Sequence, residues 1–152
     1  MTDAATEARA WAGTMRGTAP KVGEAAERTR RTSMTDVEMF AAMTGDRNPL
    51  HFDPEAAARA PFGGLIVQGG VTSGLLNAVV AEDLPGPGTV FLGVDWRFRR
   101  AVRVGEAITG RVEVTEVRED KPICRIACTV RGEDGEVALE GTAVTWTAAL
   151  AG

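Results

Sequence analysis

The chain of 152 residues contains no tyrosine, one histidine, two cysteines and only 5% aromatic residues. So few aromatic side chains do not supply the stacking platform on which single-stranded nucleic acid binds. The net charge of −4 gives no overall attraction to nucleic acid either. One histidine is too few for the facial triad of two histidines and one carboxylate that holds a mononuclear metal. We therefore expect no nucleic-acid partner and no metal.

Long hydrophobic runs are also missing. No apolar stretch approaches the roughly 20 residues that span a bilayer, and the first residues carry Asp3 and Glu7 instead of the apolar region of a secretory signal. Cys124 and Cys128 would stand about 13 Å apart on a strand, which is too far for a disulfide bond within the chain. Because reduced thiols are typical of the cytoplasm, we expect a cytoplasmic protein without a membrane partner.

What the sequence does contain is an ordinary globular composition, with 44% hydrophobic and 25% charged residues. At this length one domain with its own core is the simplest organisation. Residues 1–18 are rich in Ala, Thr and Gly, and we expect them to form a flexible or loosely docked extension. The predicted domain then covers residues 19–150.

Helices are predicted in the first half of that domain. Thr35-x-x-Glu38 matches a capping box and predicts a short helix that ends near Gly45. Asp53-Pro54-Glu55 predicts the start of a second helix over residues 54–60. The pair Gly69-Gly70 then marks the start of the most apolar helix in the chain, which is predicted over residues 70–82. Small residues at positions 70, 74 and 78 form a stripe that a curved sheet can approach closely, so we expect this helix to be buried.

Strands are predicted in the second half. Four segments rich in Val, Ile and Thr show stretches of period-two alternation: residues 89–99, 107–118, 122–131 and 136–147. Short turns join the last three, which predicts an antiparallel meander. The sequence thus predicts an α+β fold in which an antiparallel sheet wraps around one central helix.

The only histidine lies in residues 44–53, Thr-Gly-Asp-Arg-Asn-Pro-Leu-His-Phe-Asp. Pro49 fixes its own φ and keeps Asn48 out of the helical region, so we expect the segment to form a stiff turn. The Asn48 side chain can stabilise this turn by a hydrogen bond to its backbone. Such a turn can bring the Asp46 carboxylate and the His51 imidazole together on one water molecule. The alternative is a side-chain cap and a surface histidine. A calcium loop does not fit, because Leu50 and His51 stand where an acidic ligand and a glycine belong.

Two further motifs have a functional and a structural interpretation. Thr72 and Ser73 lie in a near match to the nucleophile elbow, with His51 as the base, but small hydroxyl side chains on a helix usually only pack. Arg97, Arg99, Arg100 and Arg103 could meet phosphate groups. We favour the alternative that this alternating stretch is a strand with one solvated face.

In this order, the segments resemble the MaoC-like branch of the hot-dog fold, the (R)-specific enoyl-CoA hydratases. The resemblance covers about residues 20–148, and four segments carry it: Phe40-Ala-Ala-Met-Thr-Gly-Asp-Arg-Asn-Pro-Leu-His51, Ile66-Val-Gln-Gly69, Val102-Arg-Val-Gly-Glu106 and Arg118-Glu-Asp-Lys-Pro-Ile123. It implies a single hot-dog domain over residues 19–150, with its central helix at about residues 70–82. It also implies a homodimer or higher homo-oligomer with sites near the interface.

The resemblance further implies reversible hydration of a trans-2-enoyl-CoA to an (R)-3-hydroxyacyl-CoA, with Asp46 and His51 as the catalytic pair. Coenzyme A would be part of the substrate, and no cofactor is implied. Backbone N–H groups of Gly69 and Gly70 could stabilise the charge on the thioester oxygen. A tight turn between strand and helix explains these two glycines equally well.

Three residues become candidates for the acyl pocket. The family usually has His-Gly at the helix entry, whereas this sequence has Gln68-Gly69. A serine that the family often has inside the helix is replaced by Asn77. Ser73 lies one turn before Asn77, on the same predicted helix.

Two other functions remain open. Thioesterases of this fold typically use a carboxylate of the central helix, but residues 70–80 contain none, and Glu82 and Asp83 come only at its end. A non-catalytic acyl-CoA-binding module would keep the fold and the pocket, but it would not need the Asp46–His51 geometry. The intact pair favours the hydratase.

Overall fold

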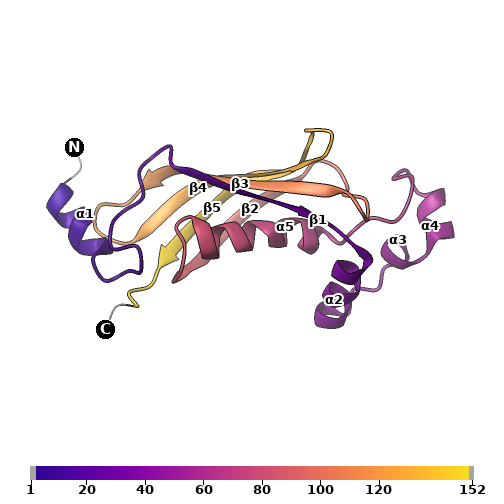
Figure 1. The fold of residues 1–152 in the computed structure, drawn as a ribbon, viewed down its shortest axis with the longest axis horizontal. Coiled ribbons are helices and arrows are strands. Elements are labelled where there is room, and N and C mark those ends of the chain that lie inside the picture. The colour runs from indigo at the N-terminus through magenta and orange to yellow at the C-terminus, as the bar shows by residue number, and fades with distance from the viewer. Residues whose placement is uncertain (1–2, 151–152) are drawn as a thin grey trace.

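The computed structural model describes residues 3–150 and is built on one five-stranded antiparallel sheet (Figure 1). The strands lie in the order β1-β3-β4-β5-β2. Their bounds are β1 Ala25–Arg31, β2 Thr89–Phe98, β3 Ala107–Val117, β4 Ile123–Gly132 and β5 Val137–Thr147. The four strands predicted in the second half of the chain are confirmed to within one residue at each end. Strands β3, β4 and β5 form the predicted meander.

The central helix lies against the inner face of the sheet (Figure 1). Helix α5 (Gly69–Ala78) continues directly into a π-helical segment, η1 (Val79–Asp83), and the two together correspond to the predicted helix over residues 70–82. Alternate residues of β4 are buried beneath it, including both cysteines. The predicted α+β hot-dog architecture is therefore confirmed, and Cys124 and Cys128 are unbridged as expected.

The prediction that the small-residue stripe of this helix is gripped by the sheet is wrong. The sheet covers the opposite face, where Leu75, Leu76 and Val79 are buried. Gly74 is exposed, and a Cβ atom added there would have no neighbour within 4 Å. The helix approaches the sheet at a glycine of β3 instead, since a Cβ on Gly110 would lie 3.1 Å from Leu75 Cγ.

The first predicted helix, α2 (Met34–Thr44), begins two residues earlier than its expected capping box allows. Its N-cap is Ser33, whose backbone N–H donates to the Asp36 carboxylate at 2.9 Å, so Thr35-x-x-Glu38 is not the capping box. The two patterns overlap with the same spacing. The earlier one is stabilised further because Arg30 of β1 pairs with Asp36.

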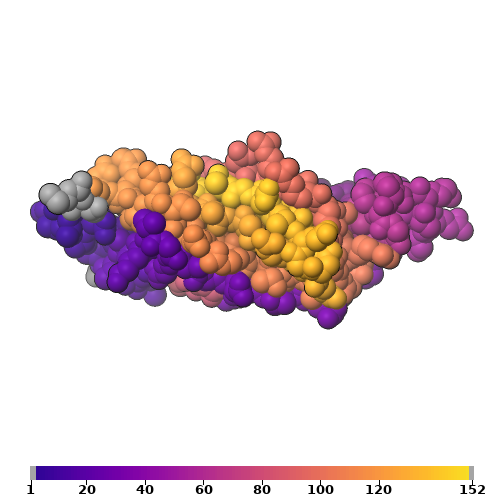
Figure 2. All heavy atoms as spheres, turned by 90° about the horizontal axis from the view of Figure 1, so that it is seen from above, coloured from indigo at the N-terminus to yellow at the C-terminus, as the bar shows by residue number. Residues whose placement is uncertain are grey.

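The two ends of the sheet carry different elements (Figure 1). Helix α2 and the short helices α3 (Pro49–Phe52) and α4 (Pro54–Arg59) extend beyond one end. In Figure 2, seen from above the sheet, α3 and α4 form the protruding tip. Helix α1 (Ala4–Trp11) lies at the other end, where the Trp11 side chain is fully buried. The division at residue 18 remains a prediction, although this tryptophan is part of the core.

No helix within residues 3–150 is both long enough and apolar enough to cross a bilayer.

Candidate active site

Successive side-chain turns shape the loop that leaves α2. Gly45 ends the helix in a left-handed conformation, with a φ of 84°, and its N–H donates to the Ala41 carbonyl at 2.8 Å. One Asp46 carboxylate oxygen, Oδ1, accepts from the Asn48 N–H at 3.2 Å. Asn48 Oδ1 in turn accepts from the Leu50 N–H at 3.1 Å and caps α3. Asn48 and Pro49 therefore occupy the loop-shaping positions that the sequence indicated.

His51, on α3, is only 7% exposed, and its ring is held from one side. Its Nδ1 lies 2.7 Å from the carbonyl oxygen of Ile66. A carbonyl oxygen can only accept, so Nδ1 carries the proton and Nε2 of the neutral ring is an acceptor. The Ile66 N–H returns a bond to the Leu50 carbonyl at 3.2 Å, which fixes the backbone on both sides of the contact.

The free nitrogen of His51 faces the carboxylate of Asp46. The distance from Nε2 to Oδ2 is 3.9 Å, which is too long for a direct hydrogen bond. Polar atoms at such a separation are commonly bridged by a water molecule. The Asp46 side chain is 38% exposed, so solvent reaches the pair. The structure thus brings the two predicted catalytic residues to a separation that a single water molecule can bridge.

A cavity of about 350 Å³ lies beside His51. Gly69 and Thr72 of α5 and Phe98 of β2 also line it. The Phe98 ring covers Gly69 so closely that a Cβ there would lie 3.1 Å from Phe98 Cε1. The first N–H groups of a helix have no partner within it and carry partial positive charge. The cavity therefore has a proton acceptor on one side and the amino-terminal end of α5 on the other.

Asp46 and the remaining predicted site residues are not part of the lining of this cavity, as far as residues 3–150 show. Gly70 packs beneath Phe40. Gln68 is 1% exposed and turns towards α2, where its Nε2 donates to the Val37 carbonyl at 3.0 Å. Ser73 Oγ is 3.5 Å from the Gly70 carbonyl, and Asn77 is exposed on α5.

Sequence reasoning did not identify Phe98 as a cavity residue. Phe98 stands opposite the buried Leu139 in the sheet, yet it is 55% exposed, although its ring contacts the first residue of α5. The alternation of Trp, Arg, Phe and Arg over residues 96–99 indicated a strand but could not show which aromatic ring would meet the helix entry. That contact depends on where β2 pairs with β5, far along the chain.

The neighbouring arginines are engaged by protein groups. Arg99 pairs with Glu140 at 2.8 Å, and Arg100 pairs with Glu106 and Asp134 at 2.5 and 2.9 Å. The Arg100 pKa lies above its usual value because Glu106 hydrogen-bonds its guanidinium. These pairs fit the structural interpretation of the basic stretch better than a role in phosphate binding.

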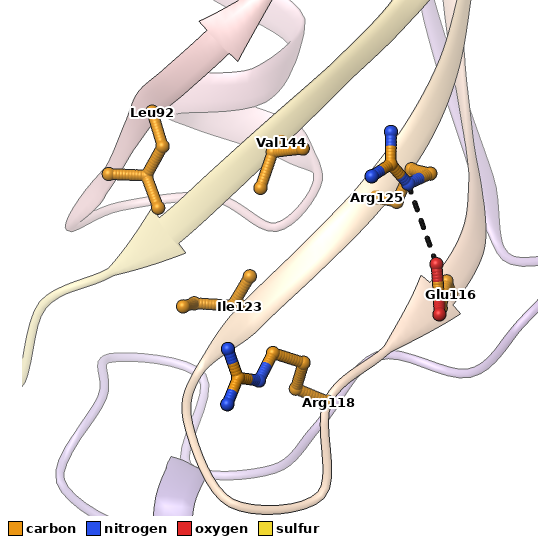
Figure 3. Close-up of a pocket in the computed structure, with 6 residues that line it drawn as sticks. All are labelled: Leu92, Glu116, Arg118, Ile123, Arg125 and Val144. Carbon is orange, nitrogen blue, oxygen red and sulfur yellow. Dashed lines mark ion pairs between the residues drawn. The ribbon is translucent and has the colours of Figure 1, made fainter.

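A second hollow, of about 340 Å³, lies on the outer face of the sheet, away from α5 (Figure 3). Leu92, Ile123, Val144 and the stem of Arg118 surround it, and Arg125 pairs with Glu116 at 3.4 Å. It contains no counterpart of the Asp46–His51 pair. Within residues 3–150, no three His, Cys, Asp or Glu side chains are grouped so that they could hold a metal ion.

Comparisons with known proteins identify the family of this chain. The family model described as MaoC like domain matches residues 17–133. The chain is 44% identical over 115 residues to a 3-hydroxybutyryl-CoA dehydratase of Methylorubrum extorquens. The aligned region covers 76% of this chain and 73% of that relative. The chain is 39% identical over 124 residues to an (R)-specific enoyl-CoA hydratase of Aeromonas caviae, with coverage of 82% and 92%, respectively.

Solved structures give the same answer. The (R)-hydratase of A. caviae involved in PHA biosynthesis superposes with a TM-score of 0.82 at 37% identity, covering 85% of this chain and 98% of that chain. The unliganded R-hydratase PhaJ1 of Pseudomonas aeruginosa gives a TM-score of 0.79 at 37% identity, with coverage of 84% and 82%. Because the family model matches most of this chain, residues 17–133, the chain belongs to the MaoC-like domain family of the hot-dog fold.

Proposed function

We propose that the protein is an (R)-specific enoyl-CoA hydratase, a hydro-lyase that converts a trans-2-enoyl-CoA reversibly into an (R)-3-hydroxyacyl-CoA. The observation that carries this proposal is the 3.9 Å separation of Asp46 Oδ2 and His51 Nε2, with Nε2 left as an acceptor by the Ile66 carbonyl. Relatives named as an enoyl-CoA hydratase and a 3-hydroxybutyryl-CoA dehydratase support the proposal, because hydration and dehydration are the two directions of one reaction.

The reaction follows from the two acceptors. A water molecule between them donates one hydrogen to Asp46 and the other to His51. As its oxygen bonds to C3 of the enoyl group, Nε2 takes the proton, and the C2–C3 π electrons move towards the thioester oxygen. The protonated imidazole then gives this proton to C2 on the same face, which makes the addition syn. General acid–base catalysis of this kind contributes about 10²- to 10⁴-fold.

The thioester oxygen gains negative charge before C2 is protonated. The backbone N–H groups of Gly69 and Gly70, at the start of α5, are the proposed donors to it. The absence of side chains at these positions lets the rings of Phe98 and Phe40 pack directly on this backbone, so a ligand would reach the N–H groups from the cavity side. The lining of one cavity by both Gly69 and His51 supports this assignment.

The proposed chemistry uses no cofactor or metal, because addition of water is redox neutral and the Asp46–His51 pair can move the proton. Coenzyme A enters only as part of the substrate. The candidates for the acyl pocket remain Gln68, Ser73 and Asn77. The cytoplasmic location inferred from the reduced cysteines likewise stays a proposal.

We further infer that two copies form a homodimer through the free edge of β2. Within the described chain, β2 pairs only with β5, so its other edge has unpaired backbone groups. Its side chains Leu92, Val94 and Phe98 are 57%, 50% and 55% exposed. Long apolar edge strands tend to pair with another chain. A second copy on this edge would also cover Phe98 and complete the wall of the His51 cavity.

The proposed activity is tested with crotonyl-CoA, by following the loss of conjugated-enoyl ultraviolet absorbance. The wild type should remove this absorbance without releasing free thiol. The Asp46→Asn variant should leave the absorbance unchanged. Thiol release would make the protein a thioesterase instead, although α5 offers no carboxylate and Asp83 is paired with Arg28 at 2.6 Å. Tight binding without turnover would identify a non-catalytic acyl-CoA-binding module.

The homodimer is tested by light scattering coupled to gel filtration. Val94→Lys places a charge in the proposed strand pairing and should shift the mass to that of one chain. Thr142→Lys, an exposed change on the neighbouring β5, is the matched control and should leave the mass unchanged. A wild type that elutes as a single chain would contradict the inference.

A further inference from the structure

We propose that Gln68 is a positioning residue that fixes the Asp46–His51 pair relative to the backbone amides at the start of α5. The proposal rests on the proposed function and adds to it a residue whose side chain need not touch the substrate. Gln68 is the N-cap position of α5, its side chain is almost completely buried, and it bonds the Val37 carbonyl in α2 at 3.0 Å.

The Gln68 bond is not required to satisfy the backbone of α2. The Val37 carbonyl lies inside that helix, where it accepts from the N–H four residues later. Because this carbonyl can only accept, the amide nitrogen of Gln68 must face it, which directs Oε1 elsewhere. Oε1 is buried and has no partner among the described residues, an arrangement that lowers stability. An apolar side chain would therefore fill the space with less cost to folding.

A second contact holds the same two helices together. A Cβ atom on Gly70 would lie 2.2 Å from the Phe40 ring, so the ring rests directly on the backbone of α5. Phe40 follows Val37 by three residues and lies on the same face of α2. Helix α2 is thus fixed to the start of α5 at two successive turns, once by a hydrogen bond and once by packing.

Both members of the catalytic pair are connected to the segment 66–70. Asp46 follows immediately after Gly45, where α2 ends, and α2 is held by Gln68 and Gly70. His51 is held by the carbonyl of Ile66. The same segment provides the N–H groups proposed to bind the thioester oxygen. Since a displacement of about 1 Å in such a constellation can cost about 100-fold in rate, the Gln68 bond has a direct route to the chemistry.

The experiment compares three variants with the wild type, using crotonyl-CoA. Gln68→Met keeps the length and apolar volume but removes the donor, and Gln68→His supplies a ring N–H donor. Glu38→Gln, on the exposed side of α2 next to Val37, is the matched control. We expect Gln68→Met to lower kcat by about 10- to 100-fold, with KM little changed and the melting temperature unchanged or raised. Gln68→His should recover part of kcat, and Glu38→Gln should match the wild type.

Hydrogen–deuterium exchange over residues 34–46 gives a readout that does not depend on activity. It should become faster in Gln68→Met and stay unchanged in Glu38→Gln. A folded Gln68→Met with wild-type kcat and wild-type exchange overturns the proposal, as does a loss of kcat that merely follows a loss of melting temperature. A wild type that does not hydrate crotonyl-CoA counts against the proposed function, while the exchange data still decide whether Gln68 holds α2.

Discussion

The two ends of the central helix are built differently. Near the amino-terminal end of α5, polar bonds between side chains and backbone hold Asp46, Asn48 and His51, and His51 lines an open cavity. At the end of η1, Trp11 and Leu84 are 0% and 2% exposed, and the region is closed by apolar packing. Apolar burial provides most folding free energy, whereas water and substrate must enter the proposed active site. Stability and activity are therefore expected to respond to changes at opposite ends of one helix.

The largest effect is expected at the open end. His51→Ala removes the only imidazole and should lower kcat for crotonyl-CoA hydration by about 10²- to 10⁴-fold, with a cooperative thermal transition retained. Steady-state kinetics and circular dichroism measure the two quantities. A His51→Ala protein that is folded and nearly as active as the wild type would remove the basis for the proposed site.

At the closed end, Trp11→Ala should act on stability alone. Truncation of a fully buried tryptophan typically lowers the free energy of unfolding by about 3–5 kcal/mol. Urea denaturation measures this change, and kcat below the transition should remain that of the wild type. If kcat fell while stability held, the separation of the two ends would be wrong.

Two glycines of α5 form a matched pair for a smaller effect. Gly70→Ala should displace the Phe40 ring and destabilise the protein by about 1–3 kcal/mol. Gly74→Ala meets no atom within 4 Å and should stabilise the helix by about 0.5–1 kcal/mol. Opposite signs in urea denaturation are the expected result. If both variants changed the free energy of unfolding in the same direction, Gly70 and Gly74 would not differ in packing as the structure shows.

The smallest effect is expected for the thiols. Burial raises the pKa of both Cys124 and Cys128 to about 12, so almost no thiolate is present in the folded protein near neutral pH. Iodoacetamide at pH 8 should leave the native protein unmodified and should add two labels after denaturation, as mass spectrometry would show. Rapid labelling of the native protein would mean that the core beside β4 is open.

Local patterns predicted much of this molecule. Period-two alternation located the strands, and Pro49 with its neighbours predicted the turn that brings Asp46 to His51. Contacts between distant segments were not accessible in the same way. The bond from His51 to Ile66, the Phe98 ring over Gly69 and the Gln68 bond to Val37 all depend on how elements dock.

The error about the small-residue stripe has the same origin. A stripe of Gly70, Gly74 and Ala78 shows only that one face of the helix permits close approach. The sheet approaches the other face because Gly110, 32 to 40 residues further along the chain than this stripe, provides the space. Helix periodicity identifies faces, but the strand that meets a face is chosen by tertiary packing.

The single imidazole can also serve as a natural spectroscopic probe of the proposed active site. His51 is the only histidine in the chain, so every imidazole nuclear magnetic resonance signal arises beside the 3.9 Å gap to Asp46. Its Nδ1 proton is held by the Ile66 carbonyl, which protects that proton from rapid exchange and fixes one tautomer. A single ¹⁵N-labelled amino acid thus gives an uncrowded spectrum of the catalytic pair, in which substrate binding, protonation and loop motion are read without any attached probe.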